Sequence, residues 1–537
     1  MVTPETKFAA PRHSPLPRIG NVRHRTLPIL GNLFIAAFVS AIIFSSAVCA
    51  NAAPKKARAK GDAALREREA DFYKMITLPT PSNVMFEAGS LCFVSKTRLA
   101  AATRIGDVYM CDNLFDDPPK PKYTLFASGL HEVLGLAWKD GWLYATERPQ
   151  LTRMKDTDGD GRADLFETVC DGWAIKGDYH EYAFGSHFDR DGNIWVLLTL
   201  TGSFTSEDPY RGWAVRVTPD GKMLPTCSGI RSPGGIGFNA EGDVFYCDNQ
   251  GPWNGADPMR QLVPGEFEGN PTGWKWFDDA ITSNAIASAG MKKPRMPEDG
   301  GREYAESKKI PELRLPAVYF PYDKMGHSGS GIACDIGGGK FGPFQKQMFV
   351  GDQSYSIVMR AALEKVDGRY QGACFPFREG FDSGCLALEF ASDGSLFVMG
   401  TDRGWGARGG KPYALQRLVW TGETPFEILE MHAKPDGFDF VFTQPVDEKT
   451  AADLASYTAD TFCYIYHASY GSPEVDHTKP GIKSATVSTD KKTVHLAMDG
   501  LVEGHIHEFH LKGIHNADGE PLLHDAAYYT LNKIPAK

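Results

Sequence analysis

Short runs of alternating hydrophobic and polar residues recur along the middle of the chain. Each run leads into a turn of the Asp-Gly type and then into a second apolar run, which is the pattern of a β-hairpin. The pattern occurs in six segments, at residues 89–113, 134–147, 182–199, 234–249, 330–353 and 385–402. The turn glycines Gly141, Gly192 and Gly242 are about 50 residues apart. Four-stranded units with a repeat of this length are typical of the blades of a β-propeller.

The repeat predicts an all-β protein with a six-bladed β-propeller over residues 86–420. Residues 251–316 interrupt the fourth repeat and are rich in glycine, proline and tryptophan, so we expect a surface insertion there. Short alternating strands continue over residues 421–537 and predict a small immunoglobulin-like β-sandwich. Residues 53–85 are rich in charge and are expected to form a linker or a short helix.

The first 52 residues have the order of an export signal. A basic stretch with one acidic residue precedes the apolar run Leu33–Val48, and Ala50-Asn51-Ala52 follows as an A-x-A cleavage site. The apolar run is 16 residues long, which is short for a membrane span. We therefore expect cleavage after Ala52, no membrane span in the mature chain, and a periplasmic or secreted protein. A lipoprotein site at Cys49 and an uncleaved anchor are the alternatives.

Charge and cysteine content narrow the classes of partner. The 537-residue chain has a formal net charge of −10, and binding to phosphates needs a basic surface, so we expect no nucleic-acid partner. The chain has 10 cysteines, but it lacks the C-x-x-C spacing of structural zinc and the C-x-x-C-H motif of c-type haem. The nine cysteines beyond Cys49 are expected to be buried small residues, with one or two disulfide bridges as the alternative.

The segment DTDGDGRADLFE at residues 156–167 has the spacing of a calcium-binding loop. Acidic residues fall at loop positions 1, 3, 5, 9 and 12 with a glycine at position 6, and calcium prefers such a ring of oxygen ligands. The flanking residues are typical of strands, so we predict a calcium-stapled hairpin rather than an EF-hand. The residues of the predicted metal site are Asp156, Asp158, Asp160, Arg162, Asp164 and Glu167. A solvated acidic turn is the alternative.

In a propeller, the residues just before the inner strand of each blade surround one mouth of the central channel. Charged and polar side chains recur at these positions, and a functional site is expected where they converge. The residues concerned are His131, Glu132, Asp178, Tyr179, His180, Glu181, Arg231, Ser232, Lys324, His327, Ser328, Asp382 and Ser383. Polar residues that only satisfy strand ends around a water-filled channel are the alternative.

Repeats three to five resemble the soluble quinoprotein glucose/sorbosone dehydrogenases, which are six-bladed propellers that use pyrroloquinoline quinone (PQQ) and calcium. The segment IRSPGGIGFNAEGDVFYCDNQGPWNGADPMRQLVPGEFEGNPTGW, residues 230–274, carries this resemblance. It implies that Arg231 lies beside the quinone and that the backbone carbonyls of Gly251 and Pro252 hold the cofactor calcium. His180 takes the position of the base that accepts the proton of the sugar hydroxyl. The expected catalytic residues are His180 and Arg231, and the expected cofactor-binding residues are Arg231, Ser232, Gln250, Gly251, Pro252 and His327.

Two cofactor-binding positions of that family differ in this sequence. No lysine lies near Ser354, and no Arg-x-Arg pair occurs at Asp382-Ser383. Over about residues 80–537 the chain also resembles large secreted propeller proteins of planctomycete-type bacteria, often labelled membrane-bound dehydrogenase-like. Relatives in that group often continue into a cytochrome c domain, so the resemblance implies an external electron acceptor such as a cytochrome.

Together these resemblances predict an exported PQQ-dependent sugar or aldose dehydrogenase-like protein that transfers hydride from a sugar hydroxyl to a quinone with calcium. Two alternatives stay open. A non-catalytic secreted propeller that binds its ligand would share the fold, because a fold alone does not give a function. A calcium-dependent lactonase-like hydrolase would need metal-binding carboxylates in the channel, for which Glu132, Asp178, Glu181 and Asp382 are the candidates.

Overall fold

The computed structural model describes residues 55–278, 291–404 and 406–536. The chain divides into two compact units, residues 1–59 and 60–537, and the fold and the sites belong to the second unit. The predicted export signal at residues 1–52 lies outside the described residues. Among the described helices, none has the length and apolar character that a membrane span requires.

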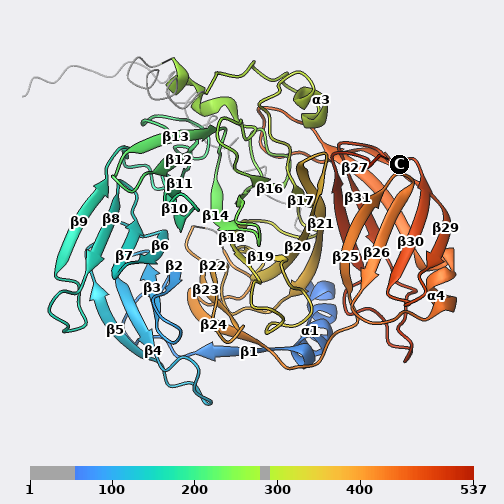
Figure 1. Ribbon diagram of the computed structural model, residues 1–537, viewed down its shortest axis with the longest axis horizontal. Coiled ribbons are helices and arrows are strands. Elements are labelled where there is room, and N and C mark those ends of the chain that lie inside the picture. Colours follow the sequence, from blue (N-terminus) through green and yellow to red (C-terminus); the bar gives the residue numbers. More distant parts are fainter. Residues whose placement is uncertain (1–54, 279–290, 405, 537) are drawn as a thin grey trace, which may run out of the picture. The chain divides into compact units, whose positions relative to one another are not determined.

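Six sets of four neighbouring antiparallel strands surround a central channel (Figure 1). This arrangement confirms the predicted β-propeller. Blade one comprises β2 (Ala88–Phe93), β3 (Leu99–Thr103), β4 (Val108–Asp112) and β5 (Lys122–Ala127). Blade two comprises β6 (Gly135–Lys139), β7 (Trp142–Thr146), β8 (Leu151–Lys155) and β9 (Leu165–Cys170). Blade three comprises β10 (Ala183–Phe188), β11 (Ile194–Leu198), β12 (Trp213–Val217) and β13 (Met223–Ser228).

The remaining blades follow in the order of the sequence. Blade four comprises β14 (Pro233–Phe238), β15 (Val244–Asp248), β16 (Asp257–Gln261) and β17 (Val318–Phe320). Blade five comprises β18 (Gly329–Cys334), β19 (Met348–Asp352), β20 (Ile357–Val366) and β21 (Arg369–Arg378). Blade six comprises β22 (Cys385–Phe390), β23 (Leu396–Thr401), β24 (Tyr413–Trp420) and the N-terminal strand β1 (Tyr73–Leu78).

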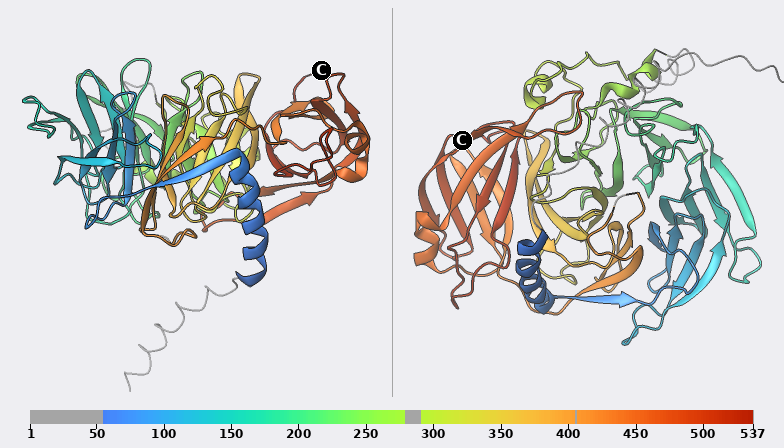
Figure 2. Two further views of the ribbon diagram at one scale, coloured as in Figure 1. Left: turned by 90° about the horizontal axis from the view of Figure 1, so that it is seen from below. Right: turned by 180° about the vertical axis from the view of Figure 1, so that it is seen from behind.

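Strand β1 closes the ring and corrects the prediction for residues 53–85. It pairs antiparallel with β24 from Tyr73↔Trp420 to Leu78↔Leu415, at the outer edge of blade six (Figure 2). The predicted linker or helix therefore contains helix α1 (Lys55–Phe72) followed by a propeller strand. Blade six therefore combines strands from both ends of the repeat region. This closes the propeller, because the ring could open only if the pairing of β1 with β24 were broken.

The insertion in blade four is shorter than predicted at its N-terminal end. Strand β16 and its pairing with β15 and β17 lie inside the range 251–316, so the insertion proper runs between β16 and β17. Its described part holds the 3-10 helix η1 (Pro271–Phe277) and helix α3 (Glu303–Ser307). Phe267, Trp274, Ile310 and Leu313 form a separate small core in this segment.

The C-terminal strands form two layers around their own hydrophobic core. One layer has the order β25-β26-β30-β29, and the other has the order β32-β31-β27-β28. The second layer continues directly into blade five, because β32 pairs with β21 at Gly372↔Thr530, Ala373↔Tyr529 and Cys374↔Tyr528 (Figure 2). The bounds are β25 (Ile428–Lys434), β26 (Gly437–Phe442), α4 (Glu448–Ala452), η2 (Leu454–Ser456), β27 (Thr458–Tyr464), β28 (Glu474–Thr478), β29 (Gly481–Val487), β30 (Thr493–Asp499), β31 (His505–His510) and β32 (Ala526–Leu531). The immunoglobulin-like topology stays a prediction, but the second domain shares a sheet with the propeller.

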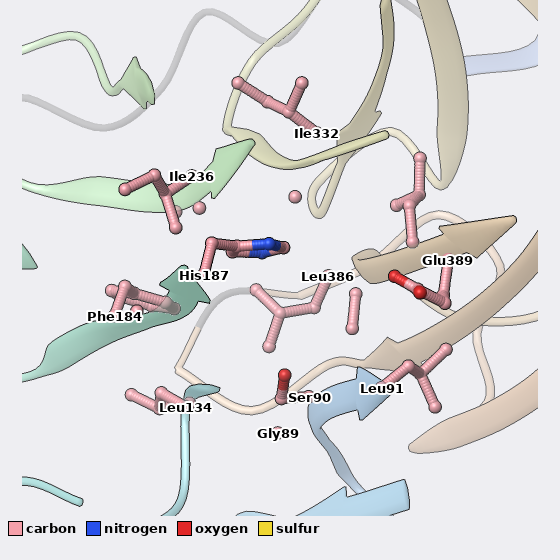
Figure 3. Close-up of a pocket in the computed structure, with 16 residues that line it drawn as sticks. Gly89, Ser90, Leu91, Leu134, Phe184, His187, Ile236, Ile332, Leu386 and Glu389 are labelled. Atoms are coloured by element: carbon pink, nitrogen blue, oxygen red, sulfur yellow. The ribbon is translucent and has the colours of Figure 1, made fainter. Parts of the chain in front are cut away.

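The inner strands of the blades line a narrow channel with about 40 Å³ of space for water (Figure 3). They approach so closely that a Cβ at Gly235 would lie 2.6 Å from Cα of Gly331, which explains the glycine-rich starts of these strands. His187 and Glu389 are the titratable residues among those that line it. Burial lowers the pKa of His187 to about 4 and raises that of Glu389 to about 8, so both are uncharged at pH 7.

A buried ionic network joins helix α1, blade five and the second domain. His524 lies 2.5 Å from Glu427 through Nδ1 and 3.1 Å from Glu69 of α1 through Nε2. Glu69 also pairs with Arg378 of β21 at 2.6 Å. Burial alone would lower the pKa of His524, but the charges and hydrogen bonds of Glu427 and Glu69 raise it to about 10. A charged imidazole therefore balances the two carboxylates at neutral pH.

Replacing His524→Gln should destabilise the protein by about 3 to 5 kcal/mol near pH 7, because it removes the buried cation that bridges Glu69 and Glu427. The folded-state pKa of His524 lies above the unfolded value of about 6.5. Its contribution is therefore complete below pH ~6.5, declines as the pH rises, and is lost above the folded pKa of about 10. Urea unfolding between pH 6 and 10.5 measures this difference.

His477→Gln is the matched control, because His477 is exposed and its ion pair with Asp460 spans 3.4 Å at the surface. The account is contradicted if the wild-type protein and the His524→Gln variant lose stability in parallel between pH 7 and 10.

Candidate functional site

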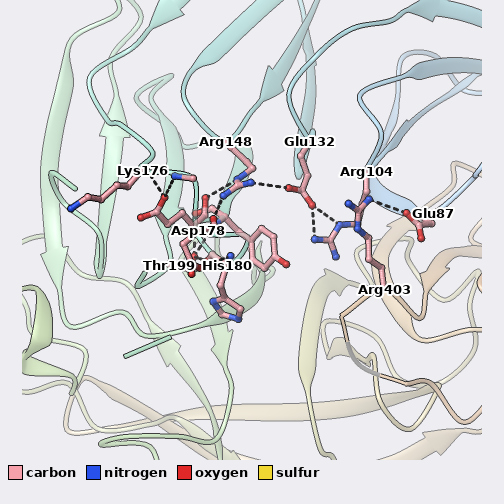
Figure 4. A network of polar contacts seen from close by, with 12 residues as sticks. Glu87, Arg104, Glu132, Arg148, Lys176, Asp178, His180, Thr199 and Arg403 are labelled. Atoms are coloured by element: carbon pink, nitrogen blue, oxygen red, sulfur yellow. Dashed lines mark hydrogen bonds and ion pairs between the residues drawn. The ribbon is translucent and has the colours of Figure 1, made fainter. Parts of the chain in front are cut away.

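The first two strands of each blade are antiparallel, so the end of the second strand and the start of the first lie at the same end of the propeller. Residues that follow the second strand therefore lie beside residues that precede the first. We call this end the mouth, and it holds most of the charged residues that the sequence analysis singled out. Figure 4 shows Glu132, Asp178 and His180 among them, together with charged residues of blades one, two and six that the sequence analysis did not single out.

An arginine–carboxylate network runs around this part of the mouth (Figure 4). Arg104 Nε donates to Glu132 at 2.8 Å, and Arg148 lies 3.7 Å from the other oxygen of the same carboxylate. Arg403 of blade six donates to Glu87 of blade one at 3.1 Å. The side chains of Arg104, Glu132 and Arg148 are all at most 10% exposed. The network therefore links neighbouring blades through ion pairs; those of Glu132 with Arg104 and Arg148 are buried, and that of Arg403 with Glu87 is partly exposed.

The carboxylates that a lactonase-like metal centre would need are already engaged. Glu132 binds the two arginines, and Asp178 accepts the backbone N–H groups of His180 at 2.8 Å and Gly202 at 3.0 Å. Glu181 accepts the N–H of Lys176 at 2.7 Å, and Asp382 pairs with Lys411 at 2.8 Å. Each acid satisfies a neighbouring group of the chain, so these side chains do not converge on one metal position.

His180 is buried and uncharged. Its imidazole is 2.8 Å from Ser203 Oγ through Nδ1 and 3.3 Å from Ser232 Oγ through Nε2. Burial, and next the positive charge of Arg231, lower its pKa to about 4. A neutral imidazole between two hydroxyl groups can accept a hydrogen bond at pH 7, but it is a weak base there.

Arg231 lies beside His180 under two aromatic rings. Its Nη1 donates to the carbonyl of Gln250 at 2.9 Å, and only 3% of the residue is exposed. The guanidinium carbon is 5.2 Å from the ring centre of Tyr470 and 5.9 Å from that of Phe204, distances typical of cation–π contacts. Its Nε has no hydrogen-bond partner among the described residues. Burial lowers the pKa of Arg231, and Asp248 opposes this shift.

Asp248 organises this part of the mouth from the end of β15. Its carboxylate accepts the backbone N–H groups of Arg231 at 2.9 Å, Ser232 at 2.7 Å and Asn249 at 2.9 Å. The structure thus brings together four of the predicted residues: His180, Arg231, Ser232 and Gln250.

His327 belongs to a different cluster in blade five. Its Nε2 is 2.7 Å from the hydroxyl of Tyr322, and its Nδ1 is 3.0 Å from Asp323. Asp352 accepts its backbone N–H at 2.7 Å, in the role that Asp248 has in blade four. His327 therefore has no contact with the His180–Arg231 pair among those that the structure describes.

Sequence reasoning missed the mouth residues Ser203, Phe204 and Tyr470, as it missed Asp248 and the network partners Glu87, Arg104 and Arg148. Ser203 and Phe204 lie in the loop after β11, whose position at a strand end was a usable signal. Tyr470 comes from the loop between β27 and β28 of the second domain, and no local pattern places that loop against blade four.

The calcium position implied by the family resemblance does not fit this chain. The carbonyl oxygen of Gly251 accepts the N–H groups of Asn254 at 3.0 Å and Gly471 at 3.1 Å, so both of its lone pairs are used. The carbonyl of Pro252 accepts from Asn270 Nδ2 at 3.0 Å. Calcium needs several free oxygen ligands, and here both lone pairs of Gly251 and one of Pro252 are already used by the chain.

Other cations that could have held a tricarboxylate cofactor are also engaged elsewhere. Lys324 binds Glu474 and Glu508 of the second domain at 2.8 and 2.5 Å. Arg360 and Arg378 are buried in the ionic network with Glu427 and Glu69. Only Arg403 and Arg408 of this group lie exposed beside the mouth, where Arg408 covers the ring of Tyr355.

The predicted calcium loop forms the turn between β8 and β9, as expected for a hairpin. Asp156, Asp158 and Asp160 each place one carboxylate oxygen within 4.8 Å of the others, and they are the only such group of three or more among the described residues. The backbone N–H of Arg162 donates to Asp160 at 2.8 Å, so its place in the loop is structural. Asp164 accepts two hydrogen bonds from Thr157, at 2.6 and 2.9 Å.

Glu167, expected at position 12 of the loop, instead pairs with Arg153 of β8 at 2.7 Å. It lies on the extended strand β9, whose direction carries it away from the turn. Of the five acidic side chains predicted to surround the calcium, only Asp156, Asp158 and Asp160 lie close together.

The nine cysteines of the described residues form no disulfide. Seven of them are buried, in agreement with their predicted role as small core residues.

The architecture defines the class of protein as an all-β six-bladed propeller with a sheet-sharing second domain. The chain belongs to the family described as "Domain of unknown function (DUF7133)", whose profile matches residues 95–374, more than half of the sequence. No curated protein matches the chain.

Several solved structures are similar to the chain. A putative oxidoreductase (glucose dehydrogenase) from Thermus thermophilus is 18% identical with a TM-score of 0.46, covering 65% of this chain and 100% of its own. The PQQ-bound aldose sugar dehydrogenase from Streptomyces coelicolor is 17% identical with a TM-score of 0.46, covering 65% and 98%. The pyranose dehydrogenase PQQ domain from Coprinopsis cinerea is 12% identical with a TM-score of 0.45, covering 65% and 97%.

If the loop 156–167 binds calcium, the ion should raise the midpoint of thermal unfolding, because a ligand that binds only the folded state stabilises it. At about 100 times its dissociation constant the gain is about 2.7 kcal/mol. The double variant Asp158→Asn/Asp160→Asn should lose this shift. Differential scanning calorimetry with calcium and with a chelator measures it.

Asp499→Asn serves as the control, since Asp499 is an exposed acid whose ion pair with Lys483 lies far along the chain from the loop. An equal calcium shift in the double variant would rule out the loop as the site.

Proposed function

We propose that this protein binds a sugar or a related polyhydroxy compound at the mouth, between blades three and four. The observation that carries the proposal is a rim of three exposed aromatic side chains, Tyr179, Phe204 and Tyr470, around the buried His180 and Arg231. These rings are 58%, 56% and 54% exposed. Exposed aromatic surface beside polar groups is a mark of a binding site rather than of a core.

Some of the exposed apolar residues lie next to mouth residues in the sequence. Eleven large hydrophobic side chains are exposed in the described part of the chain, and five of them adjoin the residues of the mouth. Met85 precedes Glu87 and Ile105 follows Arg104, while the other three are the aromatic rim. The aromatic rim beside His180 and Arg231 supports a ligand site there.

The rim has the two kinds of surface that a sugar needs. The apolar C–H face of a pyranose can lie against an aromatic ring, while its hydroxyl groups exchange hydrogen bonds with neighbouring polar groups. Phe204 and Tyr470 have ring centres 6.2 Å apart, and Tyr179 packs on His180 at 5.6 Å. Ser203, Ser232 and neutral His180 supply donors and acceptors beneath them.

The close approach of His180 and Arg231 supports a finer interpretation, in which PQQ oxidises the sugar. The carbonyls of Gly251 and Pro252, which would hold the cofactor calcium, do not support it, so the proposed function is binding. The basic, apolar and small-residue order of residues 1–52 supports the further proposal that the protein acts in the periplasm or outside the cell.

Binding of monosaccharides and disaccharides, measured by saturation-transfer NMR and titration calorimetry, tests the proposal. Phe204→Ala and Tyr179→Ala should each lower the affinity for the bound sugar about tenfold. The loss of one stacking partner corresponds to roughly 1.4 kcal/mol of binding free energy.

Phe166→Ala is the matched control, because Phe166 is also exposed but lies on β9, the outermost strand of blade two. The proposal is refuted if no sugar in the panel binds, or if the Phe166 and Phe204 variants behave alike.

A further inference from the structure

The loop between β27 and β28, residues 466–472, is docked on the mouth by backbone hydrogen bonds. We call it the capping loop. The N–H of Trp253 donates to the carbonyl of His467 at 2.7 Å, and the N–H of Gly471 donates to Gly251 at 3.1 Å. The N–H of Ser472 donates to Gly255 at 3.2 Å. The loop thus follows the segment after β15 for several residues, as a short strand would.

Side chains close the same contact from both sides. The ring of Tyr466 packs on that of Trp253, with centres 4.8 Å apart. The ring of Tyr470 lies over Arg231 at 5.2 Å. A Cβ at Gly471 would lie 2.6 Å from Gln250 Cδ, and the residue has a φ of +62°. Glycine at this position allows both the turn and the close approach.

Ion pairs hold β28, the strand that follows the capping loop, in place. Arg302 of the insertion binds Asp476 of β28 at 2.6 Å, and Lys324 binds Glu474 at 2.8 Å. The N–H of Ala468 donates to Asp299 of the insertion at 2.8 Å. The loop is therefore fixed to the propeller at its middle and near both ends.

We propose that the capping loop occupies the position that the family resemblance assigns to the quinone and its calcium. The N–H of Gly471 takes the carbonyl lone pair of Gly251 that the calcium would use. The aromatic ring of Tyr470 covers the guanidinium of Arg231 that would face the quinone. The chain fills this position with its own second domain, so a ligand arriving at the mouth meets Tyr470 rather than a bound cofactor.

This inference does not rest on the sugar proposal, since it concerns what lies against Gly251 and Arg231. It predicts that wild-type protein binds no stoichiometric PQQ in the presence of calcium. Tyr470→Gly combined with Gly471→Pro should open the position. Proline has no N–H for Gly251 and cannot adopt the positive φ of Gly471, while glycine at 470 uncovers Arg231.

The experiment is equilibrium dialysis of PQQ with 1 equivalent of protein, with calcium and with a chelator. Calcium-dependent binding should be undetectable for the wild type and reach one PQQ per chain for the double variant. Arg408, which is exposed at the mouth, remains near enough to meet the cofactor's carboxylates, whereas Arg403 is paired with Glu87. Hydrogen–deuterium exchange of residues 249–256 and 464–473 should be slow in the wild type and faster in the double variant, which confirms that the loop has undocked.

Gly519→Pro is the matched control, because Gly519 also has a positive φ (+84°) and also donates its N–H within a turn of the second domain, to Asn516 at 3.0 Å. It should behave as the wild type does. Stoichiometric PQQ binding by the wild type would overturn the inference. So would a folded double variant, undocked by hydrogen exchange, that still binds no PQQ. Sugar binding measured on the same samples decides the sugar proposal separately.

Discussion

The pairing of β21 with β32 is the contact on which the arrangement of the mouth depends. Through it, blade five and one layer of the second domain form one continuous eight-stranded sheet. Backbone hydrogen bonds between strands fix both the register and the angle of the second domain, which a flexible linker would not do. Because β27 and β28 belong to that layer, the loop that joins them is held where Tyr470 reaches Arg231. The second domain is thus part of the site.

Buried charges at the mouth mostly stabilise the fold. Asp248 and Asp352 end the second strands of blades four and five, and each accepts the N–H groups of the two residues that precede the first strand of its own blade. Strand ends leave such groups without partners in the sheet, and leaving them unsatisfied in a buried position costs roughly 1–3 kcal/mol each. Glu132 stabilises the contact between blades one and two by binding Arg104 and Arg148. The acids at this end therefore satisfy the chain itself, and the exposed aromatic rim is what remains for a ligand.

The sequence allowed the propeller to be predicted because each blade repeats a local signal. Hydrophobic alternation and a tight turn specify a hairpin without reference to the rest of the chain. The closing strand β1 was missed because its six residues follow a charged helix and pair with a strand more than 300 positions later. The insertion was placed too early because β16 has the sequence DPMRQ, in which no alternation is visible.

The candidate site was predictable in part for the same reason. His180 precedes the first strand of blade three, Arg231 and Ser232 precede the first strand of blade four, and Gln250 follows the second strand of blade four. All of these positions lie at the same end of the closed ring. The occupation of the Gly251 carbonyl could not be predicted, because its partner Gly471 comes from another domain and donates through its backbone, which carries no sequence signal. Glu167 matched a motif whose helical context is absent here, and the strand β9 directs it to Arg153 instead.

The central claim is that the second domain closes the mouth over Arg231 and leaves an aromatic rim for a sugar. The most direct test is a crystal structure of the protein after soaking the crystal with PQQ, calcium and a disaccharide that binds in solution. The account predicts sugar against Tyr179, Phe204 and Tyr470, with the N–H of Gly471 still donating to Gly251 and no PQQ beside Arg231. Calcium on the carbonyls of Gly251 and Pro252, with Tyr470 displaced by the quinone, would contradict it.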